Sequence, residues 1–549
     1  MPRLAWPKWL MTTVMIGVVC GGTAVAEEKT VYTAEEVSTL LKRLEESESR
    51  IDEFEAKLKR VEENQLKLES NDQNIVEFIS AQEVPPAPPA ATEESESEKD
   101  AVDSGTFDEF LEETEKRWEE QLDTNKALEK SIKGSVQPGG KDITMKLSGR
   151  IHLDHWAFPG DSPGTNAFET GNADNDPDDR IAFRRIRFGV GGDIWENMLY
   201  KIEMEFAGGN DVEFRDVYLG FEHLPYLQTV LIGNQKRPYG LDHLNSSRYN
   251  VFLERPFVIE AFNQDARRVG IQSYGVSDDL AYNWRYGVFN QRLIQDEGAY
   301  ISDHYQLEVA GRLAHTYWYD ECSDGRGYAH FGISGSVAHP DGSAGADAPN
   351  DLGRDQNEAR FRHRPEARST NRWLDTGRIA GAQWYELIGL EKVINVGPTQ
   401  IVGEYQYIFM QNEAGINPDM QFHGGYAYIS YFLTGEHIPW DRESGTLGRV
   451  KPFENFFLVD RCSGGTGGGW GAWQVAFRYS YCDLTDETVL GGVGSNYTLG
   501  LNWHWNPHAK IQFNYIYGEI DERSVTDING DTYSGGHYHI AGTRFVVDF

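Results

Sequence analysis

The chain has 549 residues, of which 39% are hydrophobic and 12% aromatic, and 57 are glycine. Beyond the N-terminus no run of 18 apolar residues occurs. This excludes a helical membrane protein but leaves a β-barrel open, because a barrel strand needs apolar residues only at alternate positions. The net charge of -35 disfavours non-specific binding of nucleic acid, which depends on a basic surface.

The N-terminal 26 residues have the pattern of a secretory signal peptide. Arg3 and Lys8 are followed by an apolar stretch at 9–19 and by a small-x-small cleavage site (AVA) at 24–26. The alternative, an uncleaved membrane anchor, would need a longer apolar run. Residues 1–26 therefore predict export to the envelope of a Gram-negative-type cell.

Residues 33–80 predict an α-helical coiled coil. From Val37 onward, apolar residues recur at alternating steps of three and four through about six heptads, with Glu, Lys and Arg beside them. A single charged helix in solution is the alternative. Binding of peptidoglycan and alignment of the subunits in a trimer are both open as roles for such a rod.

Two further segments separate this rod from the rest of the chain. Residues 81–106 are rich in Pro, Glu and Ser, which predicts a disordered linker. Residues 107–134 repeat apolar side chains at the helical period and predict an amphipathic helix, but the pattern does not indicate what the helix does.

The cysteines indicate neither a metal site nor a fixed disulfide. Cys20 lies in the expected signal peptide, which leaves Cys322, Cys462 and Cys482. Three thiols allow one disulfide and one free thiol in an oxidising envelope, and the pair stays open. Their spacing resembles no zinc site, so we predict no metal ion and no cofactor.

The stretch 143–156 (ITMKLSGRIHLDHW) sets the pattern for the remainder of the chain. Apolar and polar residues alternate with the period of a strand, and a length of about fourteen residues suits a tilted crossing of a bilayer. Residues 543–549 alternate in the same way, so we expect the last strand to pair with the first. Residues 143–549 thus predict an all-β fold, a 16-stranded antiparallel transmembrane β-barrel. The strands are expected near 143–156, 180–192, 195–207, 211–222, 226–236, 266–276, 280–289, 305–319, 328–339, 377–392, 398–411, 421–434, 470–483, 495–505, 508–519 and 537–549.

The connections between these strands mostly alternate between short and long. Outer-membrane barrels have this pattern, with tight periplasmic turns and longer outer loops. If the first strand starts in the periplasm, one connection breaks the rule: 435–469 is long but falls on the side of the short turns.

Inward-facing arginines are the main candidates for function. The barrel segment contains 28 Arg and only 6 Lys, and Arg suits the bidentate recognition of oxyanions. Alternation places Arg150 in the lumen. Arg184 and Arg185 interrupt the second strand, and a bulge there would point Arg185 and Arg187 inward, because an Arg facing lipid costs roughly 2–4 kcal/mol near the midplane. The alternative is that these arginines are wall residues paired with carboxylates of the third strand.

Two long connections carry further candidates. Residues 237–264 are too apolar for a free surface loop, so we expect them to fold into the barrel and bring His243, Arg248 and Arg255 to a constriction. The loop at 340–376 is rich in arginine and predicts an entrance for anions, with an ordinary charged surface loop as the alternative. Its candidate residues are Arg360, Arg362, Arg364 and Arg368.

Several segments resemble the phosphate-selective porin O/P family. The similarity implies a trimeric, sixteen-stranded outer-membrane barrel whose third outer loop forms a constriction, with an arginine ladder that leads anions to a lysine. It runs in order through FRRIRF (183–188), GLDHLNSSRYNVFLERPF (240–257), FRHRPEAR (361–368), YFLTGE (431–436), GAWQVAFRYSYCDL (471–484) and LGLNWHWNP (499–507).

The resemblance also assigns individual residues. Arg150, Arg185, Arg255 and the arginines of 360–368 match pore positions of the family. His243 stands where the resemblance implies the constriction lysine, and a histidine with a pKa of about 6.5 is neutral for much of the population near pH 7. We therefore expect anion conduction to rest on arginine.

Together these observations predict a porin of the outer membrane for passive diffusion of small anions, with phosphate or polyphosphate as the expected solutes and no catalysis. A G-x-S-x-G sequence at 160–164 lies in a polar loop with no helix expected after it, which argues against a hydrolase. The expected partners are inorganic anions, membrane lipid and further copies of the chain in a homotrimer. The alternative is a structural or adhesive envelope protein in which the barrel is an anchor and the coiled coil a periplasmic tether.

Overall fold

The computed structural model of the chain describes residues 135–136, 143–208, 212–263, 266–295, 301, 305–323, 325–340, 359–457, 459–460 and 466–549. The expected signal peptide, coiled coil, linker and amphipathic helix (1–134) lie outside these residues, and so does Cys462. Cys322 is exposed, Cys482 is buried, and both are free thiols. In this described part of the chain, no helix is long and apolar enough to cross a membrane.

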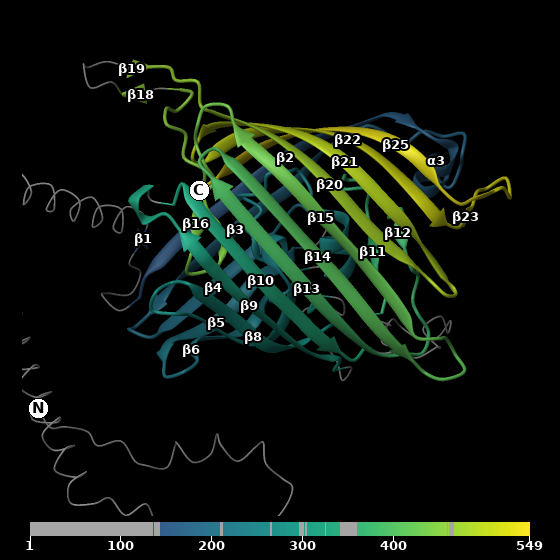
Figure 1. Ribbon diagram of the computed structural model, residues 1–549, viewed down its shortest axis with the longest axis horizontal. Helices are drawn as coiled ribbons and strands as arrows, with labels where there is room; N and C mark the ends of the chain where they lie inside the picture. The colour runs from purple at the N-terminus through teal and green to yellow at the C-terminus, as the bar shows by residue number, and fades with distance from the viewer. Residues whose placement is uncertain are drawn as a thin grey trace, which may run out of the picture. The chain divides into compact units, whose positions relative to one another are not determined.

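Sixteen antiparallel strands form a closed barrel, which Figure 1 shows with its strands tilted. Each strand pairs with the next one in sequence, and the last, β25 (Gly536–Asp548), pairs with the first, β2 (Met145–Asp161). The predicted number of strands and the predicted closure are therefore confirmed. A two-residue strand, β1 (Ser135–Val136), adds to the start of β2. The other barrel strands are β3 (Arg180–Ile194), β4 (Met198–Glu205), β5 (Glu213–Leu224), β6 (Gln228–Lys236), β7 (Arg267–Val276), β8 (Tyr282–Asn290), β9 (Leu307–Tyr319), β10 (Gly327–Ala338), β13 (Ala382–Val396), β14 (Thr399–Asn412), β15 (Met420–Phe432), β20 (Ala472–Asp486), β21 (Val489–Asn506) and β22 (Ala509–Arg523).

The strands turn apolar side chains outward and polar side chains inward. On β20, Phe477 and Tyr479 are exposed on the outside, whereas Gln474, Arg478 and Ser480 are buried inside. A wall of this kind needs an apolar residue only at every second position. This explains how a chain with 39% hydrophobic residues makes an apolar outer surface.

Strand β3 carries a β-bulge at Arg184, because its neighbours Phe183 and Arg185 pair with consecutive residues of β2. Phe183 is 51% exposed on the outside, while Arg185 and Arg187 are buried inside the barrel. The bulge predicted from the sequence is confirmed, and it directs both buried guanidinium groups away from the apolar surface.

The two ends of the barrel differ. One end, which we call the short-turn end, has brief connections such as 225–227, 397–398 and 507–508, and the chain terminates there. The opposite, long-loop end carries helix α3 (Pro163–Thr170) and the pair β23 (Val525–Thr526) and β24 (Thr532–Tyr533). Figure 1 shows α3 and β23 at the side of the barrel opposite to the C-terminus.

Helix α3 begins at Pro163, inside the G-x-S-x-G sequence (160–164), where the sequence predicts no helix, so that prediction is wrong. Pro163 at the first helical position and Gly171 in the left-handed conformation start and end the helix. The Oγ of Ser162 accepts a hydrogen bond from the backbone N–H of His537 at 2.9 Å and lies 3.3 Å from Oγ1 of Thr165. This hydroxyl therefore joins the helix to β25.

The long connection 433–471 leaves β15 at the short-turn end, as the sequence predicts. Its first half forms a hairpin of β16 (Trp440–Asp441) and β17 (Thr446–Leu447) that lies against the inner wall. The Trp440 ring stacks on the Tyr328 ring, with 5.3 Å between the ring centres, and its Nε1 donates to Oγ1 of Thr316 at 3.0 Å. We call residues 437–450 the inner hairpin. The second half carries β18 (Val459–Asp460) and β19 (Thr466–Gly467), which Figure 1 shows beyond the end of the barrel.

Two connections from the long-loop end also lie against the inner wall. The first, here called the inner loop (237–266), contains α4 (Leu241–Leu244) and α5 (Phe257–Phe262). Its Phe252 ring lies 5.6 Å from Tyr428 of β15, and a Cβ at Gly424 would come within 3.0 Å of the Val258 side chain. A small residue in the wall thus lets the apolar loop approach closely.

The second connection, here called the arginine loop, is described over 359–381. It contains β11 (Arg362–His363) and β12 (Leu374–Asp375). Its Phe361 ring packs edge-on against Phe262 of α5 at 5.7 Å, and Trp373 and Leu374 are fully buried. The described part of this connection is therefore packed rather than free, which neither sequence interpretation of the loop anticipated.

Candidate functional site

A cavity of about 330 Å³ lies inside the barrel between the walls of β2 to β8 and the inner loop. We call it the cationic chamber. Its lining contains nine basic side chains and a single acidic one, Asp216. The basic residues are Arg150, Arg185, Arg187, Lys201, Lys236, Arg248, Arg255, Arg267 and Arg285.

Some of these cations are held by carboxylates in the wall. Arg150 lies 2.7 Å from Glu203 and also donates to Oγ of Ser247 at 2.8 Å. Arg187 lies 2.6 Å from Glu205 and 3.3 Å from Glu203. Glu203 and Glu205 belong to β4, the third strand of the barrel. The alternative that wall arginines pair with carboxylates of this strand is thus correct for Arg150 and Arg187.

The other pairs involve β5 and the inner loop. Asp216 lies 2.9 Å from Lys201 and 2.6 Å from Arg267. Arg255 lies 2.8 Å from Asp242 and donates to the carbonyl of Asn245 at 3.0 Å. These contacts fix the side chains in place while leaving them at the chamber surface.

Three lining cations have no carboxylate within 4.0 Å among the described residues. Arg185 contacts Nδ1 of His152 at 3.4 Å, and its Nε has no partner there. Lys236 donates to the carbonyl oxygens of Leu244 and Asn245 at 2.8 Å. Arg285 lies over the Tyr274 ring at 5.0 Å. These three groups supply positive charge that the wall does not neutralise.

Counting the pairs shows a clear excess of positive charge. The nine basic groups have five carboxylates within 4.0 Å, on Glu203, Glu205, Asp216, Asp242 and Asp548. A cavity inside the barrel with such an excess concentrates anions, because the low-dielectric walls focus the field.

His243 does not line the chamber. Its side chain is 2% exposed, and its ring lies 5.7 Å from that of Tyr239. Burial, and then the nearby charges of Lys236 and Arg237, lower the pKa of His243 well below its ordinary value of 6.5. The imidazole is therefore neutral, and the lysine that donates to the backbone just after His243, at Leu244 and Asn245, is Lys236 at the end of β6.

The arginine loop forms a separate group. Arg360 makes two hydrogen bonds to Asp375 at 2.9 and 2.6 Å, and Arg364 donates to the carbonyl of Ser369 at 2.8 Å. The charge of Arg184, together with burial, lowers the pKa of Arg368 to about 10. Arg368 thus lies near Arg184, the bulge residue of β3, and the residue that follows Arg184 is Arg185 of the chamber.

The structure therefore divides the sequence candidates into two sets. It brings Arg150, Arg185, Arg187, Arg248 and Arg255 together in one cavity. The arginines at 360, 362, 364 and 368 are not among the lining residues of the chamber.

Sequence reasoning missed four basic residues of the chamber. Lys201 and Arg285 lie within expected strands and could have been found by alternation, since Lys201 shares the parity of the inward-facing Glu203. Lys236 ends β6 and Arg267 starts β7, where the chain leaves the wall. Alternation does not decide the side at such positions.

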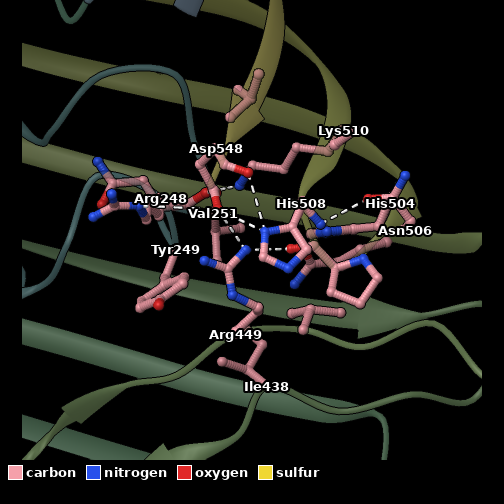
Figure 2. Close-up of a pocket in the computed structure, with 16 residues that line it drawn as sticks. Arg248, Tyr249, Val251, Ile438, Arg449, His504, Asn506, His508, Lys510 and Asp548 are labelled. Carbon is pink, nitrogen blue, oxygen red and sulfur yellow. Dashed lines mark hydrogen bonds and ion pairs between the residues drawn. The ribbon is translucent and has the colours of Figure 1, made fainter. Parts of the chain in front are cut away.

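Further basic side chains line a smaller pocket at the short-turn end, which Figure 2 shows. Arg248 and Tyr249 line both the chamber and a smaller pocket of about 20 Å³. At this pocket Arg449 and His508 point at Asp548, with distances of 2.6 and 3.3 Å.

The inner hairpin borders the same region. The backbone N–H of Leu447 donates to Oδ1 of Asn245 at 2.9 Å, and Arg312 of β9 donates to the carbonyl of Gly445 at 2.9 Å. The hairpin thus touches both the inner loop and the wall within the lumen. The lumen is occupied from both ends of the barrel.

A closed barrel with an apolar outer face and a polar, cationic interior defines an outer-membrane porin. Comparison with known proteins specifies the family: the family model described as phosphate-selective porin O and P matches residues 150–549. The chain belongs to this family. Family and fold point to a channel rather than an enzyme.

Two relatives illustrate the similarity. The chain is 28% identical over 421 residues to an uncharacterized protein of Caulobacter vibrioides, a match that covers 76% of each chain. It is 25% identical over 423 residues to Porin O of Pseudomonas aeruginosa, a match that covers 71% of this chain and 86% of that protein.

The solved structures of outer-membrane proteins that match are more distant. The trimer form of OmpT from Vibrio cholerae aligns with 74% of this chain and 100% of its own, with 12% identity and a TM-score of 0.43. The DcaP channel of Acinetobacter baumannii aligns with 75% of this chain and 99% of its own, with 10% identity and a TM-score of 0.42.

Proposed function

We propose that this porin conducts small inorganic anions by passive diffusion through the cationic chamber, with phosphate as a preferred solute. The observation that supports this most strongly is the composition of the chamber lining, with nine basic residues and one acidic residue. An anion entering the chamber exchanges hydrating water for guanidinium and ammonium donors, and this lowers the cost of passage.

The chemistry of the lining favours oxyanions. Guanidinium groups present paired N–H donors that match two oxygens of a phosphate, and such charge-assisted bonds are about twice as strong as neutral ones. The five carboxylates paired with the lining cations limit how tightly an anion binds. This balance suits a channel, because a solute must also leave.

The route that we propose starts at the arginine loop. Arg360, Arg362, Arg364 and Arg368 attract anions at the long-loop end, and Arg368 passes them to the region of Arg184 and the chamber. Polyphosphate fits the same route, because successive phosphate groups would contact both arginine sets. From the chamber, Arg248 leads to the small pocket at the short-turn end.

We expect inorganic phosphate to inhibit the chloride current of single channels in planar bilayers. Phosphate should occupy the chamber for longer than chloride because it accepts several charge-assisted hydrogen bonds. The variant Arg442→Ala tests whether this inhibition depends on the chamber. It removes a guanidinium that is paired with Glu321 at the short-turn end and does not line the chamber. It should leave the inhibition unchanged. Cation preference of the wild-type channel would contradict the anion mechanism, and a complete lack of conductance would favour the structural or adhesive alternative.

We also propose a homotrimer, exported by the expected signal peptide, whose coiled coil at 33–80 reaches peptidoglycan. Deletion of 33–80 should leave the trimer intact in a sizing experiment and abolish co-sedimentation with peptidoglycan. Loss of the trimer would instead show that the coiled coil is needed for assembly. Unchanged co-sedimentation would contradict the proposal that the coiled coil binds peptidoglycan.

A further inference from the structure

The outer wall has a groove that conduction does not use. It has a volume of about 880 Å³ and lies on the outer face of β10, β13, β14, β15 and β20. Figure 1 shows β13, β14, β15 and β20 side by side on the face turned to the viewer. Because this surface faces the hydrocarbon of the membrane, whatever fills the groove is apolar over most of its length.

The strand register explains the depression. Lys392 of β13 pairs with Gly403 of β14, which pairs with Ala427 of β15, which pairs with Tyr479 of β20. In the adjacent row, Tyr405 pairs with Gly425. Two small residues in one row and one in the next leave a groove in the outer surface between Lys392 and Tyr479.

Lys392 gives this groove a charge. Among the residues of β13, β14, β15 and β20, all of which the structure describes, it is the only Lys or Arg directed outward. Its Nζ donates to the hydroxyl of Tyr317 at 2.7 Å and lies 4.4 Å from the centre of that ring. No carboxylate of the described residues lies within 4.0 Å of it. A lone ammonium on an apolar wall needs an anionic partner or access to water.

The depth of Lys392 indicates what that partner is. It lies four residues before Val396, where β13 ends at the short-turn end. With a rise of about 3.3 Å per residue and a tilt of about 45°, its backbone is roughly 9 Å from the end of the strand. A lysine side chain extends toward the membrane surface from such a depth and reaches the level of lipid phosphates.

We propose that the groove is a binding site for one glycerophospholipid of the leaflet at the short-turn end. Its acyl chain lies over Gly403 and Ala427, and its phosphate accepts hydrogen bonds from Lys392 and Tyr317. A second copy of the chain would have to supply the anionic group from its own apolar wall, whereas a phospholipid carries it at the right level. The proposal does not depend on which solute permeates.

Native mass spectrometry of the detergent-purified full chain, titrated with phosphatidylglycerol, tests this. We expect one lipid per protomer to bind above the non-specific background. Lys392→Met keeps the length of the side chain but removes the charge, and it should weaken this binding roughly tenfold, the loss expected for one charge-assisted contact. Ala427→Phe fills the groove and should abolish it. Diacylglycerol, which lacks the phosphate that bonds to both Lys392 and Tyr317, should bind at least tenfold more weakly.

Two controls make the result decisive. Lys451→Met removes an exposed lysine of connection 433–471 and should leave binding unchanged. Heat-modifiable migration on a gel verifies that each variant is folded. Binding that survives both groove variants would overturn the proposal. So would a smaller assembly of the folded Ala427→Phe protein, because that would assign the groove to a second copy.

Discussion

Replacing Lys236 and Arg285 by glutamate is expected to abolish the anion preference of the channel. Together with Arg185 they are the chamber cations without a carboxylate partner among the described residues, so their charge is the part that the wall does not cancel. The wild-type chamber has nine basic residues and five carboxylates near them, whereas the double variant has seven of each. Lumen substitutions of this kind alter selectivity while the barrel persists. The reversal potential in a KCl gradient measures the change.

The matched control for this experiment is His243→Gln. The pKa of His243 is lowered well below 6.5 by burial and the neighbouring cations, so the imidazole is neutral at pH 7 and the substitution removes no charge. We expect its reversal potential to match the wild type, whereas Lys236→Gln should move it toward zero. An effect of His243→Gln as large as that of Lys236→Gln would instead place the functional charge on the histidine.

The barrel could be predicted because its physics is local. Side chains alternate between lipid and water at every residue, so the sequence of each strand shows which side chains face the lipid and which face the lumen. The bulge at Arg184 followed from the same rule, since an extra residue restores the alternation that the two arginines interrupt. The pairing of the first strand with the last also needed only the alternating pattern at both ends.

The contents of the lumen were harder to predict, because they depend on contacts between distant segments. The many apolar residues of the inner loop were enough to predict that it folds into the barrel. The arginine loop has buried Phe361, Trp373 and Leu374 as well, but its many arginines favoured the interpretation as an exposed entrance. Nothing local indicates that residues 437–450 turn into the barrel, because Trp440 finds its partners Tyr328 and Thr316 on distant strands.

Replacing residues 438–449 by a short Gly-Ser linker is expected to raise the single-channel conductance roughly twofold or more. The inner hairpin lies in the lumen, where it contacts Asn245 of the inner loop and Arg312 of the wall. Its removal widens the route at the short-turn end, and conductance rises as a narrow segment of a water-filled pore is enlarged. Anion preference should persist, because none of the nine basic residues of the chamber belongs to the hairpin.

A matched deletion separates this effect from general damage to the connection. Removal of 458–467 takes away β18 and β19, which Figure 1 shows beyond the end of the barrel, and leaves the inner hairpin in place. We expect the conductance of that variant to equal the wild type. If the hairpin variant also conducts like the wild type, the permeating ions do not pass the hairpin. The route from Arg248 past Arg449 and Asp548 would then be wrong, even if the chamber itself binds anions.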